Sequence, residues 1–395
     1  MQNKVTVNSL LKLIDKNVLE SIRVETKVDY KAKKLSGEVV LKLILMSILD
    51  DTKVSLRIME KVFSNTMFKH FSGIEKEETI KYNSISERLS NINHTYFEKI
   101  FQNVFDLSKS YFKEGLDEHN IRQFDSTSLS LSGKLLKKGM VNGLKNKEGE
   151  HTKSQIKFTV GLFNNLPSQL LFYNEQRYLG EDVTLREAIL KSNIQDSEIV
   201  VFDRGLKKRK TFKEFSDSNI SFVTRINPTK SIKVIERNKL DKEQETETLK
   251  ISSDELVNLY HEAKILLKER FRLIKAESKA TGETMFFLTN IEDMEAGEIT
   301  DIYRKRWDIE VFFKFIKQHL HFKHFLSYNE NGIKVMMYMT MIAATLILIY
   351  KKLNDIKSYK IAKYQFVEEL NMEIIKEIVV ICDGDPSKIP LSNNI

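Results

Sequence analysis

The chain of 395 residues contains little cysteine, proline or glycine, and these shortages exclude several classes of protein. A single cysteine, Cys382, excludes a disulfide scaffold and a cysteine-based metal centre, and it fits a reducing compartment. Only four prolines and fourteen glycines occur, so no Pro- or Gly-rich linker separates domains. The first seventeen residues lack the continuous apolar core of a signal peptide. We therefore expect a cytoplasmic protein.

Long hydrophobic runs are scarce as well. The longest uncharged apolar segment, VMMYMTMIAATLILIY at residues 335–350, is shorter than the roughly 20 residues that span a bilayer. It predicts a buried core helix, and we expect no membrane partner. Hydrophobic residues make up 41% of the chain and charged residues 30%, as in a globular protein with a sizeable core.

Positive charge is in excess. The 63 lysines and arginines outnumber the 55 aspartates and glutamates, which gives a formal net charge of +8. An excess of this kind favours a polyanionic partner, most often a nucleic acid or a membrane surface.

The hydrophobic periodicity changes along the chain. Up to about residue 118 it is helical, with Ser55 placed to cap a helix, and small basic helical domains serve either as DNA-binding or as packing and dimerisation units. From Ile121 onward, three strands are followed by an alternation of helices and strands, which predicts a mixed α/β sheet. A strand-rich stretch then precedes a long helix. The domain boundaries that we expect are 1–118 (helical), 119–228 (mixed sheet, first part), 229–292 (β-rich insertion), 293–352 (mixed-sheet domain, second part) and 353–395 (C-terminal helical tail).

The long helix is predicted from DIYRKRWDIEVFFKFIKQHL, residues 301–320, whose apolar residues recur at helical spacing. At about 100° per residue, four polar side chains fall in one narrow column beside the apolar stripe: Tyr303, Arg306, Glu310 and Lys317. Ion pairs four residues apart on a solvated face are a routine explanation for such a column. The alternative is a functional face that combines one carboxylate with several cations.

Two aspartates stand at strand positions where an isolated carboxylate is costly. Asp125 follows Phe124 in the first strand after Ile121, and Asp203 ends the apolar run IVVF. Each, taken alone, is explained by a turn or a helix cap. Together with Glu310 they supply three carboxylates from separate segments, a donor set that suits magnesium or manganese. Two such ions about 3.5–4 Å apart activate a water or a 3′-hydroxyl and stabilise the leaving oxygen in phosphoryl transfer.

In that setting the cations beside Glu310 acquire a role. Arg306 and Lys317 are suited to hold phosphate oxygens, and Tyr303 to donate its hydroxyl to a phosphate. Lys207, Lys208 and Arg209 directly follow Asp203 and are further candidates for DNA contact. The Lys- and Gly-rich segment 132–153 is either a basic loop that tracks a DNA backbone or a solvated insertion.

At this point the sequence resembles a known family. Tyr303, Arg306, Glu310 and Lys317 have the spacing of the YREK signature of insertion-sequence family-four DDE transposases, and Asp125 in FDST and Asp203 in FDRG are similar to that family's catalytic aspartates. The resemblance extends from about residue 121 to residue 323.

The resemblance implies a fold, an activity and partners. The fold would be an RNase H-like mixed sheet with a β-rich insertion, preceded by an all-helical N-terminal domain. Residues 119–228 and 293–352 would then be the two parts of the catalytic core, and residues 1–118 a DNA-binding domain. Asp125, Asp203 and Glu310 would be both the catalytic residues and the ligands of two magnesium or manganese ions. The activity would be cut-and-paste transposition, with a hairpin intermediate in related members. The partners would be double-stranded DNA, comprising terminal inverted repeats and target, and a second copy of the chain on paired ends at the nucleoid.

Two other functions stay open. One is a DNA-binding regulator derived from a transposase that has lost the chemistry. The other is a metal-dependent nuclease that cuts without joining strands. None of the three carboxylates is missing here, which favours the transposase.

Overall fold

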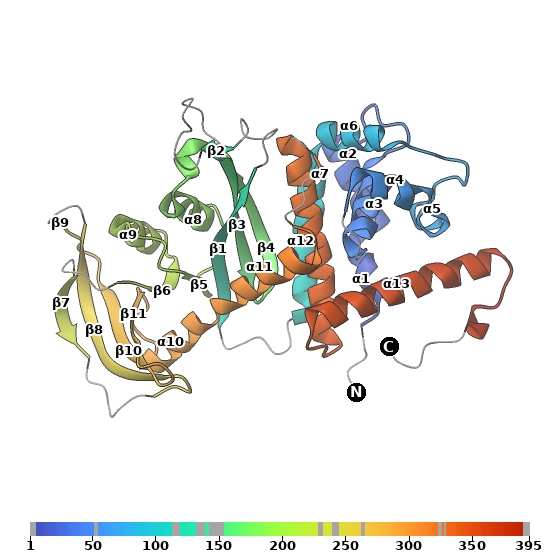
Figure 1. Ribbon diagram of the computed structural model, residues 1–395. Helices are drawn as coiled ribbons and strands as arrows, with labels where there is room; N and C mark the ends of the chain where they lie inside the picture. Colours follow the sequence, from blue (N-terminus) through green and yellow to red (C-terminus); the bar gives the residue numbers. More distant parts are fainter. Residues whose placement is uncertain are drawn as a thin grey trace. The chain divides into compact units, whose positions relative to one another are not determined.

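The computed structural model describes residues 5–50, 54–112, 119–131, 139–141, 154–227, 232–238, 245–261, 265–322, 326–327 and 329–389. The chain divides into two compact units (Figure 1). The helical unit comprises Met1–Glu114 and Phe313–Ile395, and the sheet unit comprises Gly115–Phe312. The grouping follows packing contacts and joins the two ends of the chain in one unit.

The N-terminal part of the helical unit consists of short amphipathic helices. Their apolar faces form a core that includes Phe63, Phe68 and Phe101, all fully buried. Ser55 caps one of them, because its hydroxyl accepts the N–H of Ile58 at 3.2 Å, which confirms the predicted cap. The helices are α1 (Val7–Leu11), α2 (Lys16–Thr26), α3 (Gly37–Leu49), α4 (Leu56–Ser64), α5 (Thr66–Ser72), α6 (Tyr82–Asn91) and α7 (His94–Ser108), with 3₁₀ turns at Lys12–Ile14 and Lys109–Phe112.

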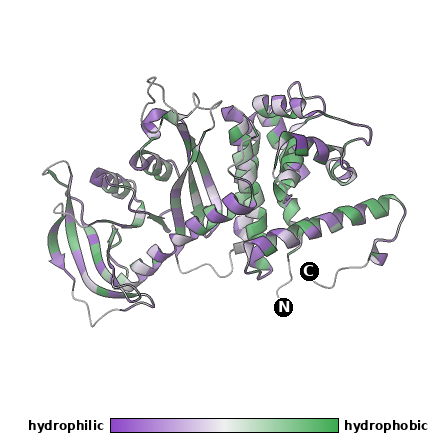
Figure 2. Cartoon of the chain, viewed as in Figure 1, coloured by the Kyte–Doolittle hydropathy of each residue, from purple (hydrophilic) through white to green (hydrophobic). Residues whose placement is uncertain are grey.

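The C-terminal part of the same unit is dominated by one apolar helix. Helix α12 (Glu330–Leu353) packs against α3, α6, α7 and α13 (Tyr359–Ile381). Among the described residues it is the helix that is long and apolar enough to cross a membrane, yet 89% of its most apolar stretch is buried within the protein. In Figure 2 much of this helix carries the green of hydrophobic residues. The prediction of a buried core helix at residues 335–350 is confirmed.

The sheet unit is built on one mixed sheet, which confirms the predicted mixed α/β architecture. In the described part of the chain the strands run in the order β2-β3-β1-β5-β6-β11-β10-β8-β7, with β4 paired to β3 and β9 to β8. Strands β1, β5 and β6 are parallel, and β3 joins β1 antiparallel. The strands are β1 (Asn120–Ser130), β2 (Met140–Val141), β3 (Ser154–Phe163), β4 (Leu166–Tyr173), β5 (Glu198–Phe202), β6 (Ser221–Arg225), β7 (Ile232–Arg237), β8 (Leu249–His261), β9 (Ile265–Leu266), β10 (Phe271–Ser278) and β11 (Thr284–Thr289).

Helices cover both faces of the sheet because successive strand residues point to opposite sides. Phe202 and Phe222 pack on one face with α8 (Glu181–Leu190) and α9 (Arg209–Asp217), the crossover helices that precede β5 and β6. Val201 and Val223 pack on the other face with α10 (Ala296–Arg304). The predicted alternation of helices and strands after the first three strands is confirmed by α8 and α9, and a 3₁₀ turn at Gln176–Tyr178 precedes α8.

The strand-rich stretch does not form a separate sheet. Strand β11 pairs antiparallel with β6, so β7, β8, β10 and β11 extend the central sheet. The longest of these strands, β8, does not stand out in the sequence because it contains the polar run Ser252–Asp254. Asp254 is nevertheless buried, because it forms an ion pair with Arg272 on β10 at 2.6 Å.

The single helix predicted for residues 301–320 is wrong. The structure contains two helices, α10 and α11 (Trp307–His319), separated by a turn at Lys305 and Arg306. The backbone N–H of Lys305 donates to the carbonyl of Ile302, and the N–H of Arg306 donates to the carbonyl of Tyr303. Bonds between residues three apart are those of a 3₁₀ turn, which is tighter than an α-helix. Apolar periodicity continues through this turn, and for that reason the sequence pattern did not reveal it.

Candidate active site

The two predicted aspartates lie on neighbouring parallel strands. Phe124 of β1 is in register with Phe202 of β5. Asp125 is the residue after Phe124, and Asp203 is the residue after Phe202. Neighbouring strands are about 4.8 Å apart, so the backbones at these two positions are adjacent. Strand alternation directs Asp125 toward the face that α10 covers.

The carboxyl group of Asp125 is held in an environment that disfavours its charge. Burial raises the pKa of Asp125 to about 7, and the neighbouring carboxylates of Asp203 and Glu181 act in the same direction. The N–H of Ser126, at 2.7 Å from Oδ1, and the guanidinium of Arg306 oppose the shift. Asp203 accepts the N–H of Gly205 at 2.8 Å. A partly buried carboxylate beside like charges is characteristic of functional sites.

Arg306 connects the third predicted carboxylate to this pair. Its guanidinium forms an ion pair with Glu310 at 2.7 Å, one helical turn along α11. It also interacts electrostatically with Asp125 and Asp203. Burial lowers the pKa of Arg306, but Tyr303, Glu310 and Asp203 outweigh this and raise the pKa overall. Arg306 therefore interacts with all three carboxylates that the sequence singled out, with Glu310 through an ion pair and with Asp125 and Asp203 electrostatically.

The other two residues of the helical column are placed differently. Tyr303 is half-buried, with its ring edge against Phe287 at 5.3 Å and the guanidinium of Arg306 over its face at 5.7 Å. Burial raises the pKa of Tyr303. Lys317 lies two turns beyond Glu310 on α11, where its ammonium group covers the ring of Phe313 at 5.0 Å. The turn at Arg306 thus leaves Tyr303, Arg306 and Glu310 together.

Whether these residues suit a divalent metal is a question of donor type and placement. Carboxylate oxygens are the ligands that magnesium and manganese prefer, and the crowding of Asp125 by Asp203 and Glu181 is relieved by a cation. In the part of the chain that the structure describes, no three His, Cys, Asp or Glu side chains are grouped as metal ligands. The chemistry of the aspartate pair therefore fits a metal, while Glu310 is engaged by Arg306.

Glu181 belongs to this site and was not singled out in the sequence. It begins α8, and it influences both Asp125 and the buried Lys157. A Cβ placed on Gly205 would lie 2.6 Å from Oε2 of Glu181 and 2.8 Å from Oδ1 of Asp203. Glycine at this position therefore allows both carboxylates to approach the same backbone. In the sequence Glu181 is an ordinary acidic residue in the first turn of a helix, which stabilises many helices.

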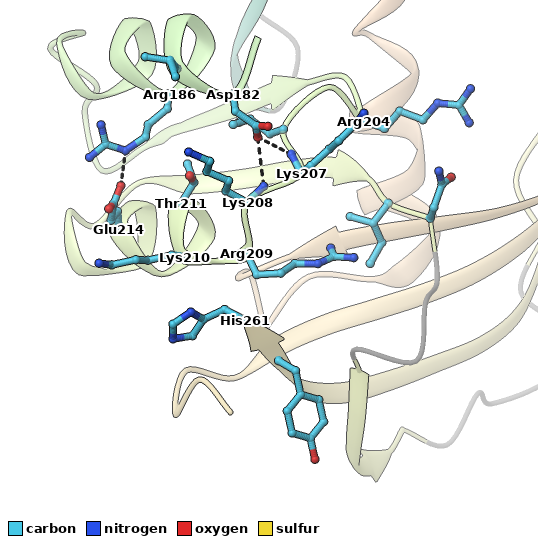
Figure 3. A pocket seen from close by; sticks show the side chains of 15 residues that line it. Asp182, Arg186, Arg204, Lys207, Lys208, Arg209, Lys210, Thr211, Glu214 and His261 are labelled. Atoms are coloured by element: carbon cyan, nitrogen blue, oxygen red, sulfur yellow. Dashed lines mark hydrogen bonds and ion pairs between the residues drawn. The ribbon is translucent and has the colours of Figure 1, made fainter. Parts of the chain in front are cut away.

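Lys207 and Lys208 lie in the loop between β5 and α9, and Arg209 is the first residue of α9. Figure 3 shows this loop beside the start of α8, where Asp182 accepts the backbone N–H groups of Lys207 and Lys208. The loop contributes to a pocket of about 830 Å³ that we call the cationic pocket. Six basic side chains line it: Arg186, Arg204, Lys207, Lys208, Arg209 and Lys210. Most of the basic segment 132–153 lies outside the described residues.

Comparison with known proteins identifies relatives of one kind. A protein of Sinorhizobium fredii that carries the name of a transposase, y4zB, is 29% identical over 163 residues, which are 41% of this chain and 45% of that protein. A Synechocystis protein named as a transposase for insertion sequence element IS4SA is 45% identical over 58 residues, 15% and 17% of the two chains. A Geobacillus stearothermophilus protein named as a transposase for IS5377 is 32% identical over 68 residues, 17% and 18%. The matched segments span less than half of each relative.

A solved structure was also found, titled as a cryo-EM structure of the piggyBac transposase synaptic complex with hairpin DNA. It covers all of this chain and 87% of the other, with a TM-score of 0.49 and 8% sequence identity. Residues 119–346, more than half of the chain, match the family described as the transposase DDE domain. That match includes Asp125, Asp203 and Glu310, and the chain belongs to the DDE transposase family.

Proposed function

We propose that the chain is a DNA transposase of the insertion-sequence family-four type, which cleaves the ends of its element and joins them to target DNA. The observation that carries the proposal is the arrangement of Asp125, Asp203 and Glu310 around Arg306 within the family match. The spacing of Tyr303, Arg306, Glu310 and Lys317 supports the family-four type and its YREK signature. The order β3-β1-β5-β6, antiparallel and then parallel, supports an RNase H-like core.

In this proposal Asp125, Asp203 and Glu310 hold two magnesium or manganese ions. Such ions, when bound, lower the pKa of a water and polarise the phosphoryl oxygens of the scissile bond. Asp125 and Asp203 are fixed by adjacent strands, so their carboxylates are positioned before the substrate arrives. The carboxylate of Glu181 approaches the backbone of Gly205, as does that of Asp203, and it provides a further acidic group that orients the aspartate pair.

The ion pair between Arg306 and Glu310 suggests how DNA completes the site. A phosphate is a strong competitor for a guanidinium because it accepts two parallel hydrogen bonds. When the DNA backbone binds Arg306, Glu310 is released from its partner and becomes available as the third ligand. Tyr303, stacked against Arg306, donates its hydroxyl to the same phosphate backbone, and Lys317 contacts DNA further along α11.

The remaining parts of the proposal concern the whole reaction. The released 3′-hydroxyl attacks the opposite strand to form a hairpin, which is reopened before joining to target DNA. A homodimer holds the two paired ends, and the N-terminal helices contribute to recognition of the terminal repeats. A pocket in the helical unit that includes Lys31, Lys33 and Lys34 supports a DNA-binding role for this unit. The protein would act on the nucleoid in the cytoplasm.

The decisive experiment is cleavage of a duplex that carries the inverted repeats flanking the coding region, with and without magnesium. Asp125→Ala, Asp203→Ala and Glu310→Gln should each reduce cleavage on the order of ten thousandfold while DNA binding persists. Asp301→Asn on α10, whose contact with Arg304 is long at 3.8 Å, is the matched acidic control and should cut normally.

Three outcomes would redirect the proposal. If Glu310→Gln cleaves like the unmodified chain, the assignment of the third carboxylate is wrong. If the unmodified chain binds the repeats but never cuts in magnesium or manganese, it is a regulator without catalysis. If it cuts without joining the released ends to a second DNA, it is a metal-dependent nuclease.

A further inference from the structure

The cationic pocket lies on the other side of the loop that begins with Asp203. Its walls come from the start of α8, from residues 204–208, from the first turns of α9 and from the end of β8 at Tyr260 and His261. The loop thus carries Asp203 at the acidic site and, from the very next residue, the lining of a basic cavity. Consecutive Cα atoms are about 3.8 Å apart, so the two environments are close neighbours.

The positive charge in this pocket is only partly neutralised by the protein. Two acidic side chains, Asp182 and Glu214, lie among the six basic ones. Glu214 pairs with Arg186, whereas Asp182 accepts backbone N–H groups (Figure 3). Within the described residues, the other five basic side chains form no ion pair with a carboxylate: Arg204, Lys207, Lys208, Arg209 and Lys210. Burial lowers the pKa of Arg209, which means that its charge is partly withdrawn from water without a counterion.

The backbone of the pocket also favours an anion. Helix α9 begins at Arg209, and its first turn contains no acidic residue. Its N-cap, Lys208, makes no side-chain cap hydrogen bond. The positive end of the helix dipole therefore faces the pocket, as in many phosphate-binding sites, and Asp182 is the acidic group that accepts the N–H of the N-cap residue Lys208. Asp182 fixes the loop through the N–H groups of Lys207 and Lys208, and it leaves both ammonium groups available.

The size of the pocket restricts what can enter. Its volume of about 830 Å³ is that of a site for a small molecule or for roughly one or two nucleotides of a single strand. A DNA duplex, whose major groove alone is about 12 Å wide, is too broad to enter it. The occupant must also carry more than one negative charge to match several unpaired cations.

We propose that the cationic pocket binds consecutive phosphates of one DNA strand, a few nucleotides from the phosphodiester held at Asp203. The continuity with the scissile bond depends on the proposed function, whereas phosphate binding in the pocket does not. By gripping the strand beyond the reacting position, the pocket would fix its direction across the aspartate pair. The pocket extends the expected DNA contacts of Lys207, Lys208 and Arg209 to Arg186, Arg204 and Lys210.

The test combines a double variant with DNA in which single phosphates are neutralised as methylphosphonates. Binding of repeat-containing DNA to the full chain is measured without metal, so that no cleavage occurs. In the unmodified chain, neutralising one to three adjacent phosphates near the repeat end should weaken binding about tenfold at each position. In the double variant Lys207→Ala/Lys208→Ala, neutralising the same phosphates should no longer weaken binding. The slope of the logarithm of affinity against the logarithm of salt concentration should become shallower by roughly two units.

The matched control removes two other exposed lysines of the same unit, in Lys233→Ala/Lys275→Ala. These residues lie on β7 and β10 and do not line the pocket, so the methylphosphonate pattern and the pocket-dependent part of the slope should persist. Circular dichroism and the melting temperature establish that both double variants are folded.

Several results would overturn the inference. One is a Lys207→Ala/Lys208→Ala chain that keeps the methylphosphonate pattern and salt slope of the unmodified chain. Another is a double substitution that weakens the binding of tripolyphosphate but not the binding of DNA, which would assign the pocket to a small polyphosphate. The proposed function is judged separately. If the chain cleaves DNA but the methylphosphonate pattern does not depend on Lys207 and Lys208, only the pocket proposal is refuted. If the pattern depends on these lysines but the chain does not cleave DNA, only the transposase proposal is refuted.

Discussion

Glu181 and Asp182 are adjacent acidic residues in the first turn of α8, yet the structure places them in opposite environments. Asp182 accepts two backbone N–H groups and borders a cationic pocket, so its charge is satisfied. Glu181 lies beside Asp203 and raises the pKa of Asp125. Two acidic residues at the same end of one helix thus differ in role. The hydrogen-bonded one stabilises the local structure, whereas crowding by like charge, as at Glu181, is characteristic of functional sites.

The loop from Asp203 to Lys208 separates these environments. On one side it carries a carboxylate toward other carboxylates, and on the other side it presents cations without anionic partners. Neither arrangement is favourable for the free protein, because like charges in a partly buried setting repel one another. A metal ion on the acidic side and DNA phosphates on the basic side would relieve both. This mutual fit connects the two proposals.

After the three carboxylates themselves, the largest effect should come from removing the cation on the acidic side. Arg306→Ala should lower end cleavage on the order of a hundredfold or more, because phosphate contacts in the transition state are lost. In the chain without DNA the same change releases Glu310. Manganese should therefore raise the melting temperature of Arg306→Ala more than that of the unmodified chain.

Cleavage should fall while the rise in melting temperature caused by manganese increases. General damage to the fold would not increase the manganese response, so the two measurements together distinguish it from the release of Glu310. A smaller manganese response in Arg306→Ala would show that Glu310 is not held back by Arg306. Arg306→Lys keeps the charge but not the bidentate geometry, and it should be intermediate in cleavage.

The next effect concerns Glu181. Glu181→Gln should lower the affinity for manganese roughly tenfold, as expected when a group that supports metal ligands is neutralised. Calorimetric titration of the full chain measures this without reference to cleavage. Asp196→Asn, an exposed acidic residue of the same unit outside the site, is the control. Equal affinity in Glu181→Gln and the unmodified chain would reduce Glu181 to an ordinary helix-end residue.

The smallest effect is expected for Asp182. Asp182→Ala removes the acceptor for two backbone N–H groups and should lower the free energy of unfolding by about 1 kcal/mol. DNA binding should weaken a few-fold because the loop is less ordered, while the rise in melting temperature caused by manganese should match that of the unmodified chain. A lost manganese response would mean that the two sides of the loop are not separate.

The sequence alone was sufficient to predict much of the candidate site, because its chemistry depends on the type and position of a few residues. An aspartate after an apolar strand is conspicuous, and the register Phe124 with Phe202 then makes Asp125 and Asp203 neighbours. Alternating strand and helix periods were also sufficient for α8, α9 and the mixed sheet. Strand β8 was missed because its buried polar residues are compensated by a partner, Arg272, that is distant in sequence.

What the sequence determined by itself was local: the strand ends that carry the aspartates, the buried helix α12, and the excess of positive charge. The tertiary structure decided which charges meet. It broke the helix at Arg306, paired that guanidinium with Glu310, and brought Glu181 to Gly205. The physical reason is that periodicity records which side chains avoid water, whereas electrostatic neighbours depend on how the chain folds back on itself.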